Sequence, residues 1–598
     1  MAARPLSLPR KLLYAAILAL AGSLLVLVVL EGTLRLIGYG YSPHFARRET
    51  RPSGETLWRD NRWCTAAYFW PALVRRPLPF RLPEKKAARS YRIFVLGSSA
   101  AMGDPEPSFS FGRILESMLQ AAYPEIHFEV VNAAITAINS HVVRDIAADC
   151  AKLEPDLFIV YEGHNEVIGP FGPGGVFAPF FQSEVAVRAL AGLKRTRTGQ
   201  LVGELSRRAT GNDSAAREWG GMPMFLRQQI PADDPRLDAV REHFAANLRA
   251  IAESARAAGA HTLLCTVPVN LRDFAPFLSL HRPDLTDDER ARWDAHYAAA
   301  QEAERNGDLA AADADYRAAL ALDDGYAELL FRAGRLALAQ GRDDDARRLL
   351  SRAVDRDALR FRTDSTLNDT IRHLRRTLPD GTEVIDLVAT LERESRAGLV
   401  GDDLLYEHVH LTFRGAYQVA RTLFTQVSSD LARRRLIGDR IPEPFDYETV
   451  RIRLAYTAHE QAMIALELVN RFRVAPFTGQ IDHAIRLAAW EQRATRATAL
   501  LGRADALPAL RELYRRALET APDDWILARN AGAMFVARQA PAEAVPLLER
   551  ARAWIDDDVD TLVPLGWALR ALDRTAEADA VFARARELEP RYPNLPPQ

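Results

Sequence analysis

Four side chains of this sequence have the types and order needed for acyl transfer through a serine. Ser99 stands in a glycine-flanked segment, Asn165 follows in a second such segment, and Glu407 and His410 lie three positions apart much later in the chain. A serine hydroxyl can attack an ester carbonyl when a histidine takes its proton, and an amide can stabilise the negatively charged oxygen that forms. We therefore expect covalent catalysis on an ester.

The position of Ser99 between two predicted elements supports this chemistry. Residues 91–97 form a β-branched and aromatic run typical of a buried strand, and a helical pattern begins near Phe111. Ser99 is therefore predicted at a strand-to-helix turn at the carboxyl edge of a sheet. There the backbone N–H groups of the following helix can point at developing negative charge.

The spacing of Glu407 and His410 lets the carboxylate hold one ring nitrogen while the other faces the serine. His408, Asp402 and Asp403 are competing candidates for these roles. A metal site using His408 and His410 is the alternative, but no further ligand cluster with metal spacing accompanies them. The sequence therefore predicts neither a metal nor a cofactor.

Five predicted strands position these residues. They cover residues 91–97, 127–132, 157–162, 261–268 and 383–388, with amphipathic helical stretches between them. Strands joined by helical crossovers imply a parallel sheet covered on both faces. The fold class predicted is α/β, of the doubly wound type.

Two other regions repeat with the 34-residue period of tetratricopeptide helix pairs. Between the fourth and fifth strands, Tyr316 is followed by Leu350, and at the C-terminus Tyr514 is followed by Leu548 and Phe582. Two repeats seldom stand alone, so the inserted pair is expected to lean on a neighbouring domain. The repeats predict a surface for a protein partner.

The N-terminus predicts a single membrane anchor. Residues 12–30 are uncharged and apolar, just long enough to cross a bilayer as a helix. Basic residues precede this stretch and Glu31 follows it, so the positive-inside rule places the N-terminus in the cytoplasm and the rest in the periplasm. The alternative is a signal peptide cleaved near residues 19–21, although the apolar stretch continues beyond that point.

Length and composition indicate several folded domains. The chain has 598 residues, 48% of them hydrophobic, and a net charge of −2 without basic runs, which argues against a nucleic-acid partner. Of three cysteines, Cys150 and Cys265 are expected in the core, and with Cys64 at most one disulfide could form. The predicted units are a cytoplasmic tip and anchor (1–40), an α/β domain in two parts (41–290 and 359–435), inserted repeats (291–358), a helical bridge (436–500) and C-terminal repeats (501–598).

The catalytic segments resemble those of the SGNH/GDSL hydrolase family of serine esterases and acyltransferases, over residues 90–290 and 359–430. The family's first block is Gly-Asp-Ser with a later Gly, which Gly97, Ser99 and Gly103 match while Ser98 replaces the Asp. In its second block Ala134 stands where the family has a Gly whose backbone N–H joins the oxyanion hole.

The remaining two blocks are similar to the family's in spacing. Residues 163–166 read Gly-His-Asn-Glu where the family has Gly-x-Asn-Asp, and Glu407 and His410 fit its Asp-x-x-His. The continuation at residues 411–417 resembles the family's, which favours His410 over His408.

The resemblance implies a flavodoxin-like sheet of the SGNH type with a Ser99–His410–Glu407 triad. It also implies an oxyanion hole from Ser99, Ala134 and Asn165. The function expected is a membrane-anchored extracytoplasmic serine esterase acting on an acyl ester, such as that of a glycan or a lipid. The alternatives are an O-acyltransferase on an exported polysaccharide and an inactive scaffold that recruits partners through its repeats.

Overall fold

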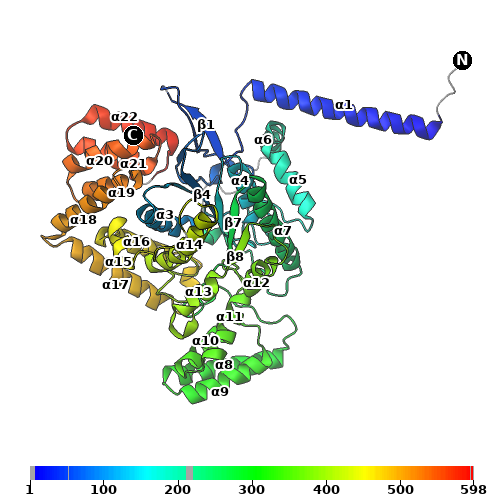
Figure 1. The fold of residues 1–598 in the computed structure, drawn as a ribbon. Coiled ribbons are helices and arrows are strands. Elements are labelled where there is room, and N and C mark those ends of the chain that lie inside the picture. Colours follow the sequence, from blue (N-terminus) through cyan, green and yellow to red (C-terminus); the bar gives the residue numbers. More distant parts are fainter. Residues whose placement is uncertain (1–6, 52, 211–219, 439, 593, 597–598) are drawn as a thin grey trace.

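A parallel five-stranded sheet lies at the centre of the α/β part (Figure 1). The computed structural model describes residues 7–51, 53–210, 220–438, 440–592 and 594–596. The strands are β4 (Ser90–Gly97), β5 (His127–Asn132), β6 (Leu157–Tyr161), β7 (His261–Cys265) and β8 (Thr382–Ile385). Their order is β5-β4-β6-β7-β8, with every neighbouring pair parallel. In chain order this reads 2-1-3-4-5, as in doubly wound sheets of the flavodoxin type.

All five predicted strands are present, and the last two end three residues earlier than predicted. Beyond β7, the backbone N–H and carbonyl of Val267 pair with the side chain of Asn368 at 2.9 and 3.0 Å instead of with a strand. Beyond β8, the Asp386 side chain accepts from the N–H of Ala389 and caps a helix. Hydrogen bonds to side chains therefore end both strands.

Helices cover both faces of the sheet (Figure 1). On one side α3 (Phe111–Ala122) packs against α14 (Phe413–Arg433) and β5. On the other, α7 (Arg236–Ala257) packs against α4 (Ser140–Cys150), α12 (Ser365–Leu374) and β7. The short helices α2 (Ser99–Met102) and α13 (Leu387–Arg393) follow β4 and β8. Cys150 and Cys265 are buried, as predicted, and both are free, as is Cys64.

Residues 46–83, for which the sequence analysis predicts no strand, contain a second sheet. It is antiparallel, with β1 (Ala46–Thr50), β2 (Thr56–Asp60) and β3 (Arg81–Pro83) in sequence order. These strands are short and rich in charge, so they lack the apolar alternation that indicates a strand. Arg59 of β2 is instead buried in ion pairs with Glu49 of β1, at 2.7 Å, and with Asp557 of the C-terminal region.

The inserted region forms two antiparallel helix pairs. Its helices are α8 (Asp287–Arg305), α9 (Leu309–Leu322), α10 (Ala327–Ala339) and α11 (Asp343–Asp355), with α8 packed on α9 and α10 on α11. They lie below the sheet, apart from the C-terminal helices (Figure 1).

The C-terminal third is entirely helical in its described part. Its helices are α15 (Tyr447–Arg453), α16 (Ala458–Phe472), α17 (His483–Leu501), α18 (Ala506–Thr520), α19 (Trp525–Ala537), α20 (Pro541–Trp554), α21 (Val559–Ala571) and α22 (Thr575–Leu588). The closest pairs are α16 with α17, α19 with α20 and α21 with α22. The bridging helices α15–α17 connect the α/β part to these repeats.

A glycine facing a bulky side chain explains the 34-residue period. A Cβ at Gly532 would lie 2.5 Å from Leu548 Cγ, and a Cβ at Gly566 would lie 2.6 Å from Phe582. Gly334 faces Leu350 in the same way in the inserted repeats, at 2.8 Å. In each case the glycine is on the first helix of a pair and the bulky residue on the second, so the helices can approach closely.

One long apolar helix stands at the N-terminus. Helix α1 (Leu8–Leu36) has 29 residues, a mean hydropathy of 2.7 over its most apolar window, and no buried residue in that window. It projects away from the body (Figure 1), and α6 (Arg197–Thr210), which packs on α5 (Glu184–Arg195), lies beside its last turns. By length and composition it could be a membrane span or a signal sequence.

Candidate active site

Ser99 is the first residue of α2, directly beyond the buried strand β4, and it is partly exposed. The turn that carries it depends on Gly97. A Cβ at this position would lie 2.1 Å from the carbonyl oxygen of Tyr161 and 2.7 Å from the Cβ of Ala101. No side chain fits there, so the glycine lets β4 approach β6 closely just before the serine.

Gly103 ends α2 and turns the chain back toward the site. Its φ of 96° lies in the left-handed region, and a Cβ there would be 2.5 Å from the Cβ of Ser110. The backbone N–H groups of Gly103 and Asp104 both donate to the carbonyl of Ser99, at 3.0 and 3.1 Å. The backbone of Asp104 therefore lies next to that of the serine.

The structure brings Ser99, His410 and Glu407 into one hydrogen-bonded row. His410 Nε2 is 2.9 Å from Ser99 Oγ, and His410 Nδ1 contacts Glu407 Oε1. Glu407 is fully buried and His410 is 6% exposed. A carboxylate can only accept, so Nδ1 carries the proton and Nε2 is free to accept from the serine hydroxyl.

A closed loop, rather than a helix, brings Glu407 and His410 together. Leu405 and Leu411 form an isolated antiparallel bridge, and the N–H of Tyr406 donates to the carbonyl of His410 at 2.8 Å. Asn270, beyond β7, donates its side-chain amide to the carbonyl of Glu407 at 3.1 Å. The three-residue spacing therefore works here through a tight β-bridged loop.

His408 points away from Ser99 even though it shares Glu407 with His410. Its Nδ1 contacts the other Glu407 oxygen, and its ring packs on Phe274 and Phe277 with centroids 5.6 and 5.2 Å away. Burial lowers the pKa of His408, so it stays neutral. Burial alone would raise the pKa of Glu407, but the two histidines hold it well below its usual range.

Asp402 and Asp403 pair with arginines elsewhere. Asp402 pairs with Arg486 at 2.9 Å, and Asp403 pairs with Arg272 at 2.6 Å. Neither aspartate is hydrogen-bonded to His410, so among the acids weighed from the sequence it is Glu407 that contacts this histidine.

A second charged pair, which could not be predicted from the sequence, faces His410. Asp104 Oδ2 lies 3.5 Å from His410 Nε2 and 2.5 Å from the guanidinium of Arg471. The same guanidinium nitrogen is 3.7 Å from Glu407 Oε1. Arg471 comes from α16 in the helical bridge, so no local sequence signal connects it with the serine.

These charges set the protonation of the site. Burial opposes the imidazolium, but Glu407 and Asp104 outweigh it and raise the pKa of His410. Burial would raise the pKa of Asp104, but Arg471 and His410 lower it. Burial likewise opposes the charge of Arg471, whose pKa Asp104 and Glu407 nevertheless raise. Asp104 and Arg471 therefore remain an ion pair next to the histidine.

The three predicted oxyanion donors follow adjacent strands. Ser99, Ala134 and Asn165 come after β4, β5 and β6, which lie side by side. The N–H of Ala134 is already directed at Asn132 Oδ1, at 3.2 Å. The amide of Asn165 donates one hydrogen to the carbonyl of Ile138 at 2.9 Å, which leaves its second hydrogen for another acceptor.

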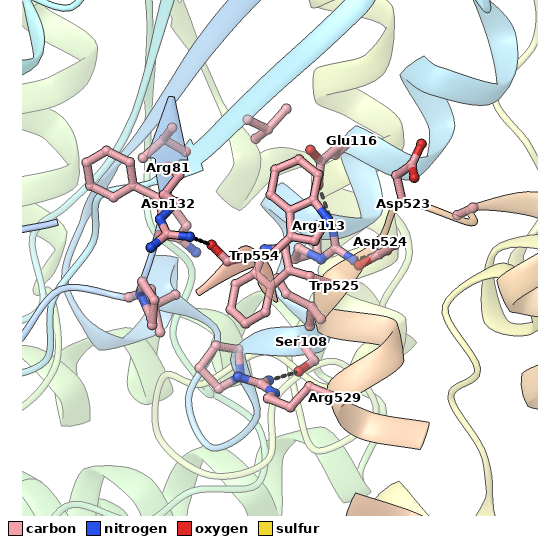
Figure 2. A pocket seen from close by; sticks show the side chains of 18 of the residues that line it. Arg81, Ser108, Arg113, Glu116, Asn132, Asp523, Asp524, Trp525, Arg529 and Trp554 are labelled. Atoms are coloured by element: carbon pink, nitrogen blue, oxygen red, sulfur yellow. Dashed lines mark hydrogen bonds and ion pairs between the residues drawn. The ribbon is translucent and has the colours of Figure 1, made fainter. Parts of the chain in front are cut away.

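A large cavity lies between the α/β part and the C-terminal repeats (Figure 2). Its volume is about 1320 Å³, and it lies between α3, β5 and α19. Arg113 of α3 pairs with Glu116 and Asp524 at 2.5 Å each, and Arg529 of α19 donates to Ser108 at 3.0 Å. Residues 105–108, which follow the Ser99 turn, form part of its wall. The repeats are thus held against the loop next to the serine.

Comparisons with known proteins give tetratricopeptide domains. No protein-family model matches the chain, and no curated protein does. One similar solved structure is the TPR2AB domain of yeast Sti1 in complex with pHSP90, at 14% identity and a TM-score of 0.14, covering 51% of this chain and 93% of that one. Another is the TPR domain of P58(IPK), at 14% identity and a TM-score of 0.16, covering 51% and 95%.

The comparisons correct the family prediction. The assignment to the SGNH/GDSL family is wrong, because no family model matches and the similar structures described above are tetratricopeptide domains. The helical repeats are supported by the helix pairs of this structure. The site at Ser99 is supported by the geometry described above.

Proposed function

We propose that this chain is a serine-dependent acyl-transfer enzyme built together with a helical-repeat scaffold. One observation carries the proposal: Ser99 Oγ lies 2.9 Å from His410 Nε2, while the buried Glu407 contacts the opposite ring nitrogen. A partly exposed serine with a base on one side and a buried carboxylate behind that base is the arrangement that activates a hydroxyl.

Acylation begins when Ser99 Oγ attacks the carbonyl carbon of an ester and His410 Nε2 takes the hydroxyl proton. Glu407 keeps the ring in place and stabilises the imidazolium. The free amide hydrogen of Asn165 and the backbone N–H of Ser99 are the donors available to the negatively charged oxygen. The C–O bond then breaks as His410 returns the proton to the departing alcohol, which leaves an acyl group on Ser99.

The second half of the reaction repeats these roles with a new nucleophile. Water or a second alcohol attacks the acyl group while His410 takes its proton, and the proton then returns to Ser99. Water gives hydrolysis, and an alcohol gives transfer of the acyl group. A hydroxyl-bearing glycan is an acceptor of the second kind.

We place the site outside the cytoplasm, with α1 as an uncleaved membrane anchor. Arg10 and Lys11 precede the apolar run and Glu31 follows it, which by the positive-inside rule favours a cytoplasmic N-terminus. The alternative reading of α1 as a cleaved signal sequence predicts a shorter mature chain.

The experiment is to follow p-nitrophenyl acetate turnover by the purified full-length protein in detergent. We expect a burst of p-nitrophenol equal to the enzyme concentration or steady turnover, absent from Ser99→Ala and His410→Ala and retained by Ser429→Ala, a matched serine of α14. Mass spectrometry should place the acetyl group on Ser99. No release by a folded wild-type protein would contradict the proposal.

A second role, binding of a protein partner, is favoured by the two sets of helix pairs, α8–α11 and α19–α22. Stacked helix pairs provide extended surfaces for partners. The two roles separate genetically: complementation of a deletion strain by Ser99→Ala would show that the scaffold suffices, whereas failure of this variant at normal abundance would show that the serine is needed.

A further inference from the structure

Helices α5 and α6 form a hairpin with an exposed apolar stripe. On α5, Val185 and Leu193 are 76% and 53% exposed, and Ala189 stands between them at four-residue spacing. On α6, Val202 and Leu205 are 57% and 55% exposed. Large apolar side chains on neighbouring helices are rarely left in water together without a partner.

The hairpin is held to the body by its other face, so the stripe faces outward. Val187 and Ala191 of α5 are buried at 0% and 1% exposure. Each lies two residues after a member of the stripe, which corresponds to a rotation of about 200° around the helix. One face of α5 therefore packs on the α/β part while the opposite face presents Val185 and Leu193.

The turn of the hairpin, where α6 begins, lies where α1 reaches the body (Figure 1). Glu31 of α1 accepts from the backbone N–H groups of Arg197 and Thr198, at 3.1 and 2.8 Å, and so caps the first turn of α6. The chain that leaves α1 continues along α6, where Tyr41 exchanges two hydrogen bonds with the side chain of Gln200 at 2.9 and 3.1 Å. Glu31 also marks the end of the apolar run of α1.

The charge of the hairpin fits an anionic surface. Residues 184–210 contain six basic and two acidic side chains, a net charge of +4 in a chain whose total is −2. One of the six, Arg195, is turned inward and pairs with Asp145 and Asp149 of α4, so the outward-facing excess is smaller but still positive. A basic helix with an apolar stripe and a location at the end of a membrane span is typical of helices that lie in the lipid headgroup region.

We propose that the α5–α6 hairpin lies on the membrane surface, with its apolar stripe between the headgroups and acyl chains of anionic lipids. This inference rests on the proposed role of α1 as a membrane anchor. The hairpin gives the body a second contact with the bilayer, next to the first. It fixes the orientation of the α/β part and its serine relative to the membrane, which a single helix with a free linker would not do.

Depth-dependent fluorescence quenching tests the proposal. Single cysteines at Val185, Val202, Leu24 of α1 and Ile485 of α17 would carry a bimane label in the full-length protein. The native cysteines are buried, and Ile485 is 75% exposed on a helix on the opposite side of the body from α1 (Figure 1). The protein would be reconstituted into phosphatidylcholine–phosphatidylglycerol vesicles. Quenchers would be nitroxide-labelled lipid and aqueous iodide.

We expect the labels at Val185, Val202 and Leu24 to be quenched at least twofold more by the nitroxide lipid than by iodide, and the label at Ile485 to show the reverse. Quenching by lipid at Leu24 with iodide access at Val185 and Val202 would overturn the hairpin proposal and leave the anchor intact. Loss of lipid quenching at Leu24 would overturn the anchor itself. Shielding of Val202 from both quenchers would indicate a protein contact and would also overturn the proposal.

Discussion

Replacing Arg471 by methionine should shift the pH dependence of catalysis by His410. In the native site, the Arg471 guanidinium neutralises Asp104, whose carboxylate lies 3.5 Å from His410 Nε2. The same guanidinium is also 3.7 Å from the carboxylate of Glu407. Without this positive charge, both carboxylates favour the imidazolium, so the pKa of His410 rises. Because only neutral His410 can take the proton of Ser99, the active pH range shrinks from its acid side.

The size of the shift follows from the distances. The two contacts of 2.5 and 3.5 Å place the guanidinium at most about 6 Å from Nε2. At an effective dielectric constant of about 20, Coulomb's law gives about 3 kcal/mol, or about 2 pKa units. In the variant Asp104 loses its partner, so its own pKa rises as well. Asp104 and His410 then compete for the same proton, which reduces the shift at His410. We therefore expect a net upward shift of about one unit.

The assay is the pH profile of p-nitrophenyl acetate turnover. The acid limb of Arg471→Met should move about one unit to higher pH, with the rate recovering at alkaline pH. Arg471→Lys should retain most of the native profile, and adding Asp104→Asn to Arg471→Met should move the limb back. The groups to consider around His410 are Glu407, Asp104, Arg471 and the neutral His408. An equal loss of rate at all pH values, with lysine no better than methionine, would refute this reasoning.

Three further outcomes are expected. Glu407→Gln should lower the turnover of p-nitrophenyl acetate on the order of 1,000-fold or more, because the amide no longer fixes the proton on the far ring nitrogen; an unchanged rate would remove Glu407 from the triad. Gly97→Ala should abolish turnover and lower the melting temperature, because its Cβ would meet backbone atoms of β6; a native melting curve would contradict this. Gly532→Val should destabilise the protein by about 1–3 kcal/mol in urea through its clash with Leu548, whereas Gly192→Ala, where nothing lies within 4 Å of the added Cβ, should not; equal urea midpoints would show that close helix approach is not what the period encodes.

The sequence was sufficient to predict the residues that follow strands. The end of an apolar run marks the end of a buried strand. Adjacent parallel strands bring the residues that follow them to one edge of the sheet, so Ser99 and Asn165 could be placed at this edge before their contacts were known. The spacing of Glu407 and His410 predicted their contact but not the structure that produces it, which is a loop closed by a β-bridge between Leu405 and Leu411.

The contribution of Arg471 could not be predicted. It depends on how α16 packs against the α/β part, and its partner Asp104 is 367 positions away in the chain. The sheet of residues 46–83 was missed because buried ion pairs such as Arg59 with Glu49 replace apolar alternation there.

The family prediction failed because the matching segments are very short compared with the chain. Blocks of four residues describe a local turn, and a turn does not determine the rest of the chain. The 34-residue period was a stronger signal, because each recurrence requires a glycine and a bulky residue on facing helices, as at Gly532 and Leu548.

The most direct test of an activated serine is covalent labelling of the purified full-length protein by a fluorophosphonate probe, with the adduct located by mass spectrometry. We predict a single adduct on Ser99 in the wild-type protein and its loss in His410→Ala. A folded wild-type protein that stays unlabelled while a small, uncharged probe labels a control serine esterase, or an adduct on another residue, would contradict the account.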